Sequence, residues 1–91
     1  MSEQTITLEF LEKEFDFIVT RDSYNKFINS TTPTNKIQPM VNFLTTTVKE
    51  TERAELVEII KNKAGYELQI GGALLEAYIP DLAVTVKKRN K

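Results

Sequence analysis

Apolar and polar residues alternate in two short runs near the N-terminus, 5–10 (TITLEF) and 15–20 (FDFIVT). A period of two places every second side chain on the same side of a strand, so each run predicts a strand with one apolar face. Residues 11–14 between the runs predict a β-hairpin, but they contain no Gly or Asn to define its turn type. A two-stranded hairpin is marginal alone, so other elements must cover its apolar face.

The apolar period becomes helical after residue 20 and predicts two short helices separated by a polar linker. Thr20 or Asp22 caps the first helix, which ends near Ser30. The linker that follows, STTPTNKIQP, ends at Pro39. Proline fits the first turn of a helix, and the apolar residues of 40–48 follow it at helical spacing. The central block 23–44 therefore consists of two apolar helix faces joined by a proline-punctuated linker.

Two further helices and a last strand complete the prediction. Thr51 is expected to cap a third helix that Gly65 terminates, and apolar residues at helical spacing over 66–77 predict a fourth, which ends before Pro80. The adjacent pair Gly71-Gly72 weakens that fourth helix and favours close packing of another element within the domain. Residues 82–86 alternate again and predict a strand.

The order of these elements predicts an α+β fold. We expect an N-terminal β-hairpin, about four short helices that cover one face of the sheet, and a C-terminal strand that joins the hairpin. If that strand stays free, its edge is available to pair between subunits. With 91 residues, the chain is expected to form a single domain over 1–91, ordered over about 4–86 and flexible in the basic tail 87–91.

The composition argues against an enzyme. The sequence has no histidine and no cysteine, so it lacks the usual general base, the usual nucleophilic thiol and the usual ligands of zinc. The carboxylate pairs belong to an expected turn and a first helical turn, where solvent exposure is the simpler explanation. We expect no catalytic residues, no metal and no cofactor, so any function is one of contact.

Charge is unevenly distributed along the chain. The net charge is −1, but residues 1–22 are rich in Asp and Glu, and the end carries Lys87, Lys88, Arg89 and Lys91. If the last strand joins the hairpin, the basic tail is expected to approach the acidic first segment. The near-neutral balance argues against general nucleic-acid binding, and a solvated terminus is the simpler interpretation of the tail.

The N-terminal residues MSEQTITLEF lack a basic region that leads into an apolar run, and no stretch approaches 18 apolar residues. The expected location is therefore the cytoplasm, with no membrane partner.

Several stretches in the same order resemble the small phage tail assembly chaperones of siphophage-type phages and related prophages. The resemblance runs from about Gln4 to Val86. Its most specific pieces are Tyr24-Asn25-Lys26, Asn35-Lys36, Pro39, Asn42-Phe43-Leu44, Tyr78 and Pro80-Asp81-Leu82. Relatives tend to have an Asn-Gly-like hairpin turn where this chain has Leu11 to Glu14, which leaves the turn geometry open.

The resemblance implies a non-enzymatic role in the cytoplasm of a bacterial host. Such a protein binds the long, helical tape measure protein, helps tail tube subunits assemble around it, and is absent from the mature virion. A homo-oligomer is also compatible with this role. We expect an apolar groove bordered by Tyr24, Phe27, Met40 and Phe43, with a polar rim of Asn25, Asn35, Lys36 and Asn42.

Two other classes of function stay open at this point. One is a small phage regulator that contacts nucleic acid through the basic tail, which predicts binding that falls steeply with salt. The other is a minor structural protein that remains in the virion.

Overall fold

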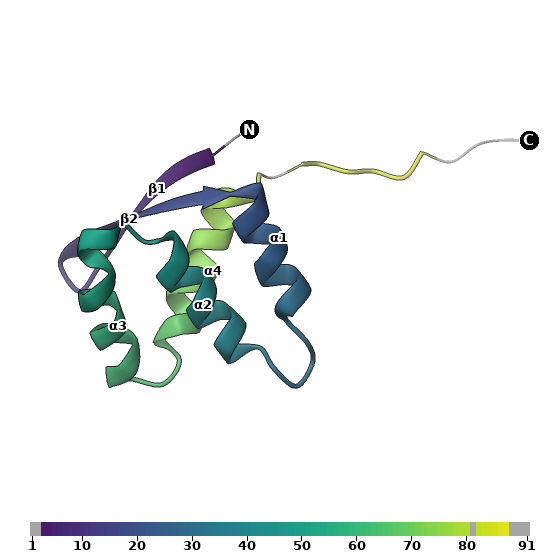
Figure 1. Cartoon of the computed structure of the whole chain (residues 1–91). Helices are drawn as coiled ribbons and strands as arrows, with labels where there is room; N and C mark the ends of the chain where they lie inside the picture. The colour runs from purple at the N-terminus through teal and green to yellow at the C-terminus, as the bar shows by residue number, and fades with distance from the viewer. Residues whose placement is uncertain (1–2, 81, 88–91) are drawn as a thin grey trace, which may run out of the picture.

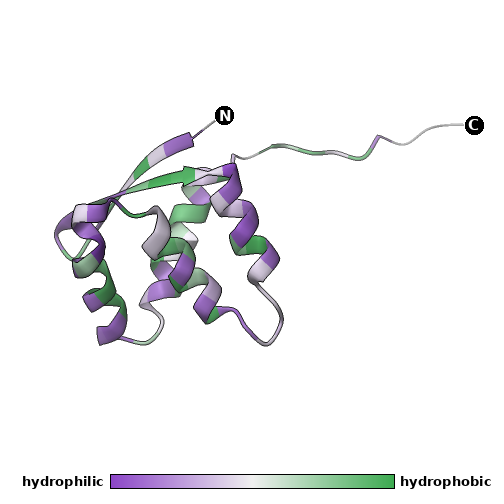
Figure 2. Ribbon diagram, in the orientation of Figure 1, coloured by the Kyte–Doolittle hydropathy of each residue, from purple (hydrophilic) through white to green (hydrophobic). Residues whose placement is uncertain are grey.

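The computed structural model describes residues 3–80 and 82–87 and has the α+β architecture expected from the sequence (Figure 1). An antiparallel hairpin comes first, and four helices follow it on one side of the sheet. Apolar residues of the helices and of the hairpin form one hydrophobic core, and Figure 2 shows hydrophobic positions on the ribbons of both.

The hairpin confirms the first two predicted strands. β1 (Glu3–Phe10) pairs with β2 (Lys13–Thr20), with Ile6 opposite Phe17 and Leu8 opposite Phe15. The turn is shorter than the predicted connection, because only Leu11 and Glu12 lie outside the strands, with φ of 54° and 62°. Positive φ at both residues is the geometry of a type I′ turn, which matches the twist of paired strands. Residues with a Cβ adopt it at a cost of about 1 kcal/mol each.

The two edges of the hairpin differ. On the outer edge of β2, Val48 forms a β-bridge with Phe17, and the Lys49 amide donates to the Asp16 carbonyl at 2.8 Å. The outer edge of β1 has no strand partner among residues 3–80 and 82–87. The outer edge of β2 is therefore blocked at its middle, whereas the outer edge of β1 is open.

Helices α1 (Arg21–Ser30) and α2 (Ile37–Thr47) occupy the central block. Thr20 is the N-cap of α1, so the first of the two predicted caps is the right one. Pro39 lies in the first turn of α2, where a missing amide hydrogen costs no helical hydrogen bond. α2 contacts all three other helices and β2, which makes it the centre of the helical layer.

The third helix begins later than predicted. Residues Glu50–Glu52 form a short 3₁₀ turn, η1, and α3 (Arg53–Asn62) starts after it, so the prediction of Thr51 as its cap is wrong. The chain is held in this tighter turn because the Glu52 carboxylate accepts from the Asp16 amide at 2.9 Å. Gly65, with φ of 97°, makes the left-handed turn that leads from α3 to α4 (Tyr66–Tyr78).

Only Gly71 of the glycine pair has a packing role. A Cβ built on Gly71 would lie 2.7 Å from Cε and 2.9 Å from Cγ of the buried Met40, and still closer to its sulfur. A Cβ on Gly72 would meet nothing within 4 Å. The glycine pair thus marks close packing of α4 on α2, as predicted from the sequence. Only Gly71 is needed for this packing.

This difference predicts opposite effects of the same substitution. Gly72→Ala should raise the free energy of unfolding by about 1 kcal/mol, since alanine favours the helix and the site is open. Gly71→Ala should lower it by about 1 kcal/mol, because the cost of displacing Met40 exceeds the same gain in helix propensity. Chemical denaturation of both variants measures this. An equal stabilisation by the two would mean that Met40 has room to move.

The predicted C-terminal strand is wrong. Residues 82–87 form no strand, and Leu82, Val84 and Val86 are 77%, 75% and 89% exposed. The segment leaves the end of α4 and extends away from the hairpin, so it meets no strand edge (Figure 1). Lys87 therefore does not approach the acidic first segment in this structure. Lys88, Arg89 and Lys91 of the predicted tail lie outside the described residues.

Candidate functional site

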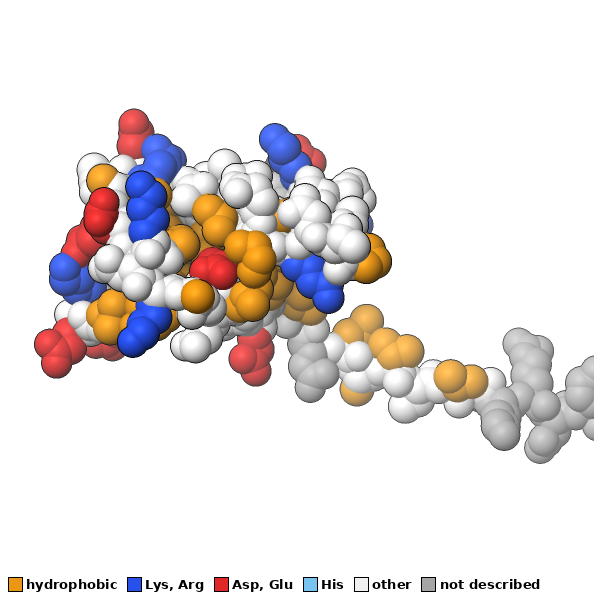
Figure 3. Space-filling view, turned by 90° about the horizontal axis from the view of Figure 1, so that it is seen from below, with side chains coloured by type: hydrophobic (Ala, Val, Ile, Leu, Met, Phe, Trp, Pro, Cys, Tyr) orange, Lys and Arg blue, Asp and Glu red, His pale blue; other side chains and the backbone are white. Residues whose placement is uncertain are grey.

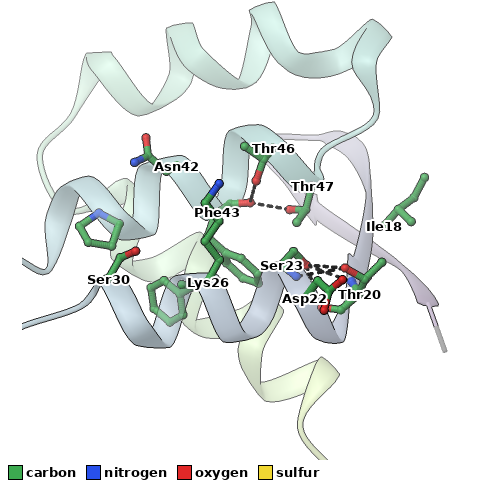
Figure 4. A pocket seen from close by; sticks show the side chains of 12 residues that line it. Ile18, Thr20, Asp22, Ser23, Lys26, Ser30, Asn42, Phe43, Thr46 and Thr47 are labelled. Carbon is green, nitrogen blue, oxygen red and sulfur yellow. Dashed lines mark hydrogen bonds between the residues drawn. The ribbon is translucent and has the colours of Figure 1, made fainter. Parts of the chain in front are cut away.

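A groove of about 540 Å³ lies between α1 and α2 and ends at β2 (Figure 4). We call it the α1–α2 groove. Its apolar lining residues are Ile18, Phe27, Pro39 and Phe43. Its polar lining residues are Thr20, Asp22, Ser23, Lys26, Ser30, Asn42, Thr46 and Thr47.

The floor of this groove belongs to the hydrophobic core. The rings of Phe27 and Phe43 stack with centroids 5.1 Å apart and an interplanar angle of 29°. Their exposed fractions are only 9% and 3%, so each ring supports the fold while one part of its surface lines the groove. Such a floor is rigid, because moving either ring would disturb the core.

A capping box fixes the wall that α1 contributes. The Thr20 amide donates to Ser23 Oγ at 3.0 Å, and the Ser23 amide donates to Thr20 Oγ1 at 3.1 Å. These bonds satisfy two amides that would otherwise lack partners at the helix start. They also tie α1 to the last residue of β2, so the entrance of the helix and the hairpin move together (Figure 4).

The wall that α2 contributes carries threonines, which are poor helix formers. The hydroxyls of Thr46 and Thr47 donate to the Phe43 carbonyl at 3.2 Å and 2.8 Å. Arg53 Nε donates to the Thr45 carbonyl at 2.7 Å and satisfies one of the last carbonyls of α2. The threonine hydroxyls are thus bonded within their own helix, as Figure 4 shows, and the wall is polar without a buried unpaired group.

The structure brings together Phe27, Asn42 and Phe43 of the predicted site residues, which all line the α1–α2 groove. Two other predicted residues face α4 instead. The ring of Tyr24 packs on Tyr78 with centroids 5.5 Å apart, and Met40 is buried against Gly71.

The remaining predicted site residues are exposed and lie outside the groove lining. Asn25 is on α1. Asn35 closes the linker turn through two backbone hydrogen bonds with Thr32, at 3.1 and 3.2 Å, and Lys36 is the N-cap residue of α2. The polar rim beside the groove consists instead of side chains such as Asp22, Lys26 and Thr46.

Sequence reasoning missed a second groove, of about 370 Å³, between the turn end of β1 and α3 and α4. We call it the β1–α4 groove. Its lining residues are Leu8, Glu9, Phe10, Leu11, Ile59, Tyr66, Gln69, Ile70 and Ala73. One signal for this groove was in the sequence, because Leu11 is an apolar residue in a predicted hairpin turn. In the structure its side chain is 56% exposed.

Both grooves are lined by a mixture of apolar and polar side chains. In the part of the chain that the structure describes, no group of three or more His, Cys, Asp or Glu side chains could hold a metal ion. Within residues 3–80 and 82–87, no helix combines the length and apolar character needed to cross a membrane. The two grooves present shape, apolar surface and polar rims, which are the means of recognising another protein.

Comparisons with known proteins agree with the resemblance seen in the sequence. A family model described as phage tail assembly chaperone matches residues 6–88. The chain is also similar to a protein of Haemophilus phage HP1 (strain HP1c1) described as an uncharacterized 11.3 kDa protein in lys 3'region. The two are 26% identical over 83 residues, which are 91% of this chain and 80% of that protein. No solved structure matches the chain.

Proposed function

This chain belongs to the phage tail assembly chaperone family, and from that premise we propose that it binds the tape measure protein and assists assembly of the tail tube around it. The observation that carries the proposal is the family match over residues 6–88, which includes both helices of the α1–α2 groove. We propose further that the role is non-enzymatic, that it is carried out in the cytoplasm of the bacterial host, and that the protein is absent from the finished virion.

The α1–α2 groove is the proposed binding site for a client helix. An amphipathic helix binds by placing its apolar face in an apolar groove. The Phe27 and Phe43 rings provide such a floor, and Ile18, 42% exposed, extends it onto β2. The rim of Asp22, Lys26 and Asn42 provides polar contacts along both sides.

Release of the client is as necessary as capture, because the tape measure protein must end inside the tube. The floor is narrow, since most of the surface of both phenylalanines is already buried in the core. Only the apolar surface that is still exposed can be buried when the client binds, so the affinity should be moderate. Tail tube subunits that compete for the tape measure protein would then displace the chaperone without ATP.

Co-expression with the tape measure protein tests this proposal. The tape measure protein alone is expected in the insoluble fraction, and with this chain it should become soluble and co-purify. Insolubility in both cases, with no complex recovered, would contradict the proposal. Recovery of the chain in purified virions would indicate a structural component instead. Salt-sensitive binding to DNA, without binding to the tape measure protein, would indicate a regulator.

A further inference from the structure

The C-terminal arm, residues 82–87, has the composition of a strand without a partner. Leu82, Val84 and Val86 alternate with Ala83 and Thr85, and the three larger apolar side chains are at least 75% exposed. Figure 3 shows hydrophobic side chains along the arm, outside the body of the protein. Exposed apolar side chains at a period of two favour pairing with a sheet edge.

The hairpin offers one open edge for such a strand. β2 is closed by Val48 and Lys49, whereas β1 has no partner on its outer side within the described residues. An incoming strand on β1 would satisfy backbone amides and carbonyls of that edge. The second edge is blocked, so the position of an added strand is defined.

The β1–α4 groove lies beside this open edge. Its strand residues come from β1 and the turn, and none comes from β2, so the groove opens on the β1 side. A strand added to β1 would direct alternate side chains toward Leu8, Ile70 and the other apolar residues of the groove. The alternation of the arm supplies apolar side chains at that period.

Charge favours the same pairing. The arm ends at Lys87, and the sequence continues with Lys88, Arg89 and Lys91. The hairpin carries five acidic residues, Glu3, Glu9, Glu12, Glu14 and Asp16. Its basic residue, Lys13, already forms an ion pair with Glu55 of α3. A C-terminal sequence with these basic residues, next to an acidic hairpin, brings opposite charges together.

We propose that the arm of one copy of this chain adds as a strand to β1 of a second copy, with its apolar side chains in the β1–α4 groove. A second copy suits the geometry better than the same chain. The groove lies beside the first half of α4, whereas the arm leaves from the other end of that helix and points away from the body (Figure 1). Reciprocal exchange gives a two-fold dimer in which each arm fills one groove.

Sedimentation of the full chain across a concentration series tests this inference. Wild type should dimerise, and Val84→Asp should weaken dimerisation at least tenfold. Thr85→Asp is the matched control, since the neighbouring side chain points away from the groove in a strand. A wild-type protein that stays monomeric at all concentrations would overturn the proposal. The arm would then pair with the hairpin of its own chain or bind another protein. Equal effects of the two variants would also overturn it.

The receiving surface has its own matched pair. Ala73 and Ala77 are both exposed on α4, but only Ala73 lines the β1–α4 groove. Ala73→Glu should therefore weaken the dimer and Ala77→Glu should not. Mixing the Val84→Asp and Ala73→Glu proteins should recover mixed dimers, because one intact arm meets one intact groove; failure to recover any would contradict the exchange. This inference does not rest on client binding, which uses the other groove.

Discussion

Replacing Phe17 by alanine is expected to lower the free energy of unfolding by about 3 to 5 kcal/mol. Phe17 is 0% exposed, lies opposite Ile6 in the hairpin and forms the bridge to Val48 that follows α2. Its ring thus lies where both strands meet the helical layer, and its removal leaves a cavity there. A chain of this length has a total stability of roughly 5 to 14 kcal/mol, so the substitution should remove a large share of it.

Urea or guanidinium denaturation followed by circular dichroism measures this loss. Ile18→Ala is the control, because Ile18 is the next residue of β2 but is 42% exposed and points to the other side of the strand. Its effect should stay within about 1 kcal/mol. A similar loss in both variants would mean that the hairpin is not held by the packing of this face.

The regular elements could be predicted because their signals are local. Alternation over 5–10 and 15–20 gave both strands, and the helical spacing of apolar residues gave the four helices. The start of α3 could not be predicted in this way. Thr51 is a good cap by residue type, but Glu52 bonds to the Asp16 amide, a partner 36 residues earlier in the sequence, and the chain enters the helix through a 3₁₀ turn.

The last predicted strand failed for a related reason. Residues 82–86 have a strand pattern, but a strand also needs a free sheet edge within reach. The sequence does not show where the end of α4 places these residues relative to the hairpin. The β1–α4 groove lies beside the first half of α4, and the arm follows the opposite end of that helix. The local preference of these residues for a strand is thus present, but the sheet edge with which they would pair is not within their reach.

The candidate site was only partly accessible to sequence reasoning. The helical period shows which residues share a face, but α1 and α2 each contact more than one neighbour. Phe27 and Phe43 meet between the two helices, whereas Tyr24 and Met40 pack toward α4. Asn25, Asn35, Lys36 and Asn42 were predicted as the rim, but the linker turn carries Asn35 and Lys36 away from the groove.

Client binding at the α1–α2 groove predicts a large effect of Asn42→Arg. Asn42 is exposed on α2, lines the groove, and accepts from Gln38 at 3.0 Å in a solvent-exposed hydrogen bond. An arginine at this position would extend its long side chain over the mouth of the groove without removing any core contact. The affinity for the tape measure protein should fall at least tenfold, about 1.4 kcal/mol, while the free energy of unfolding should change by less than about 0.5 kcal/mol.

The measurement that decides the matter is the dissociation constant of Asn42→Arg compared with that of Asn29→Arg, each with the tape measure protein. Asn29 is exposed on α1 and does not line the groove, and both variants make the same substitution and add the same charge. Weakened binding by Asn42→Arg alone is the predicted result. Wild-type affinity in Asn42→Arg, or an equal loss in both variants, would contradict a client site between α1 and α2.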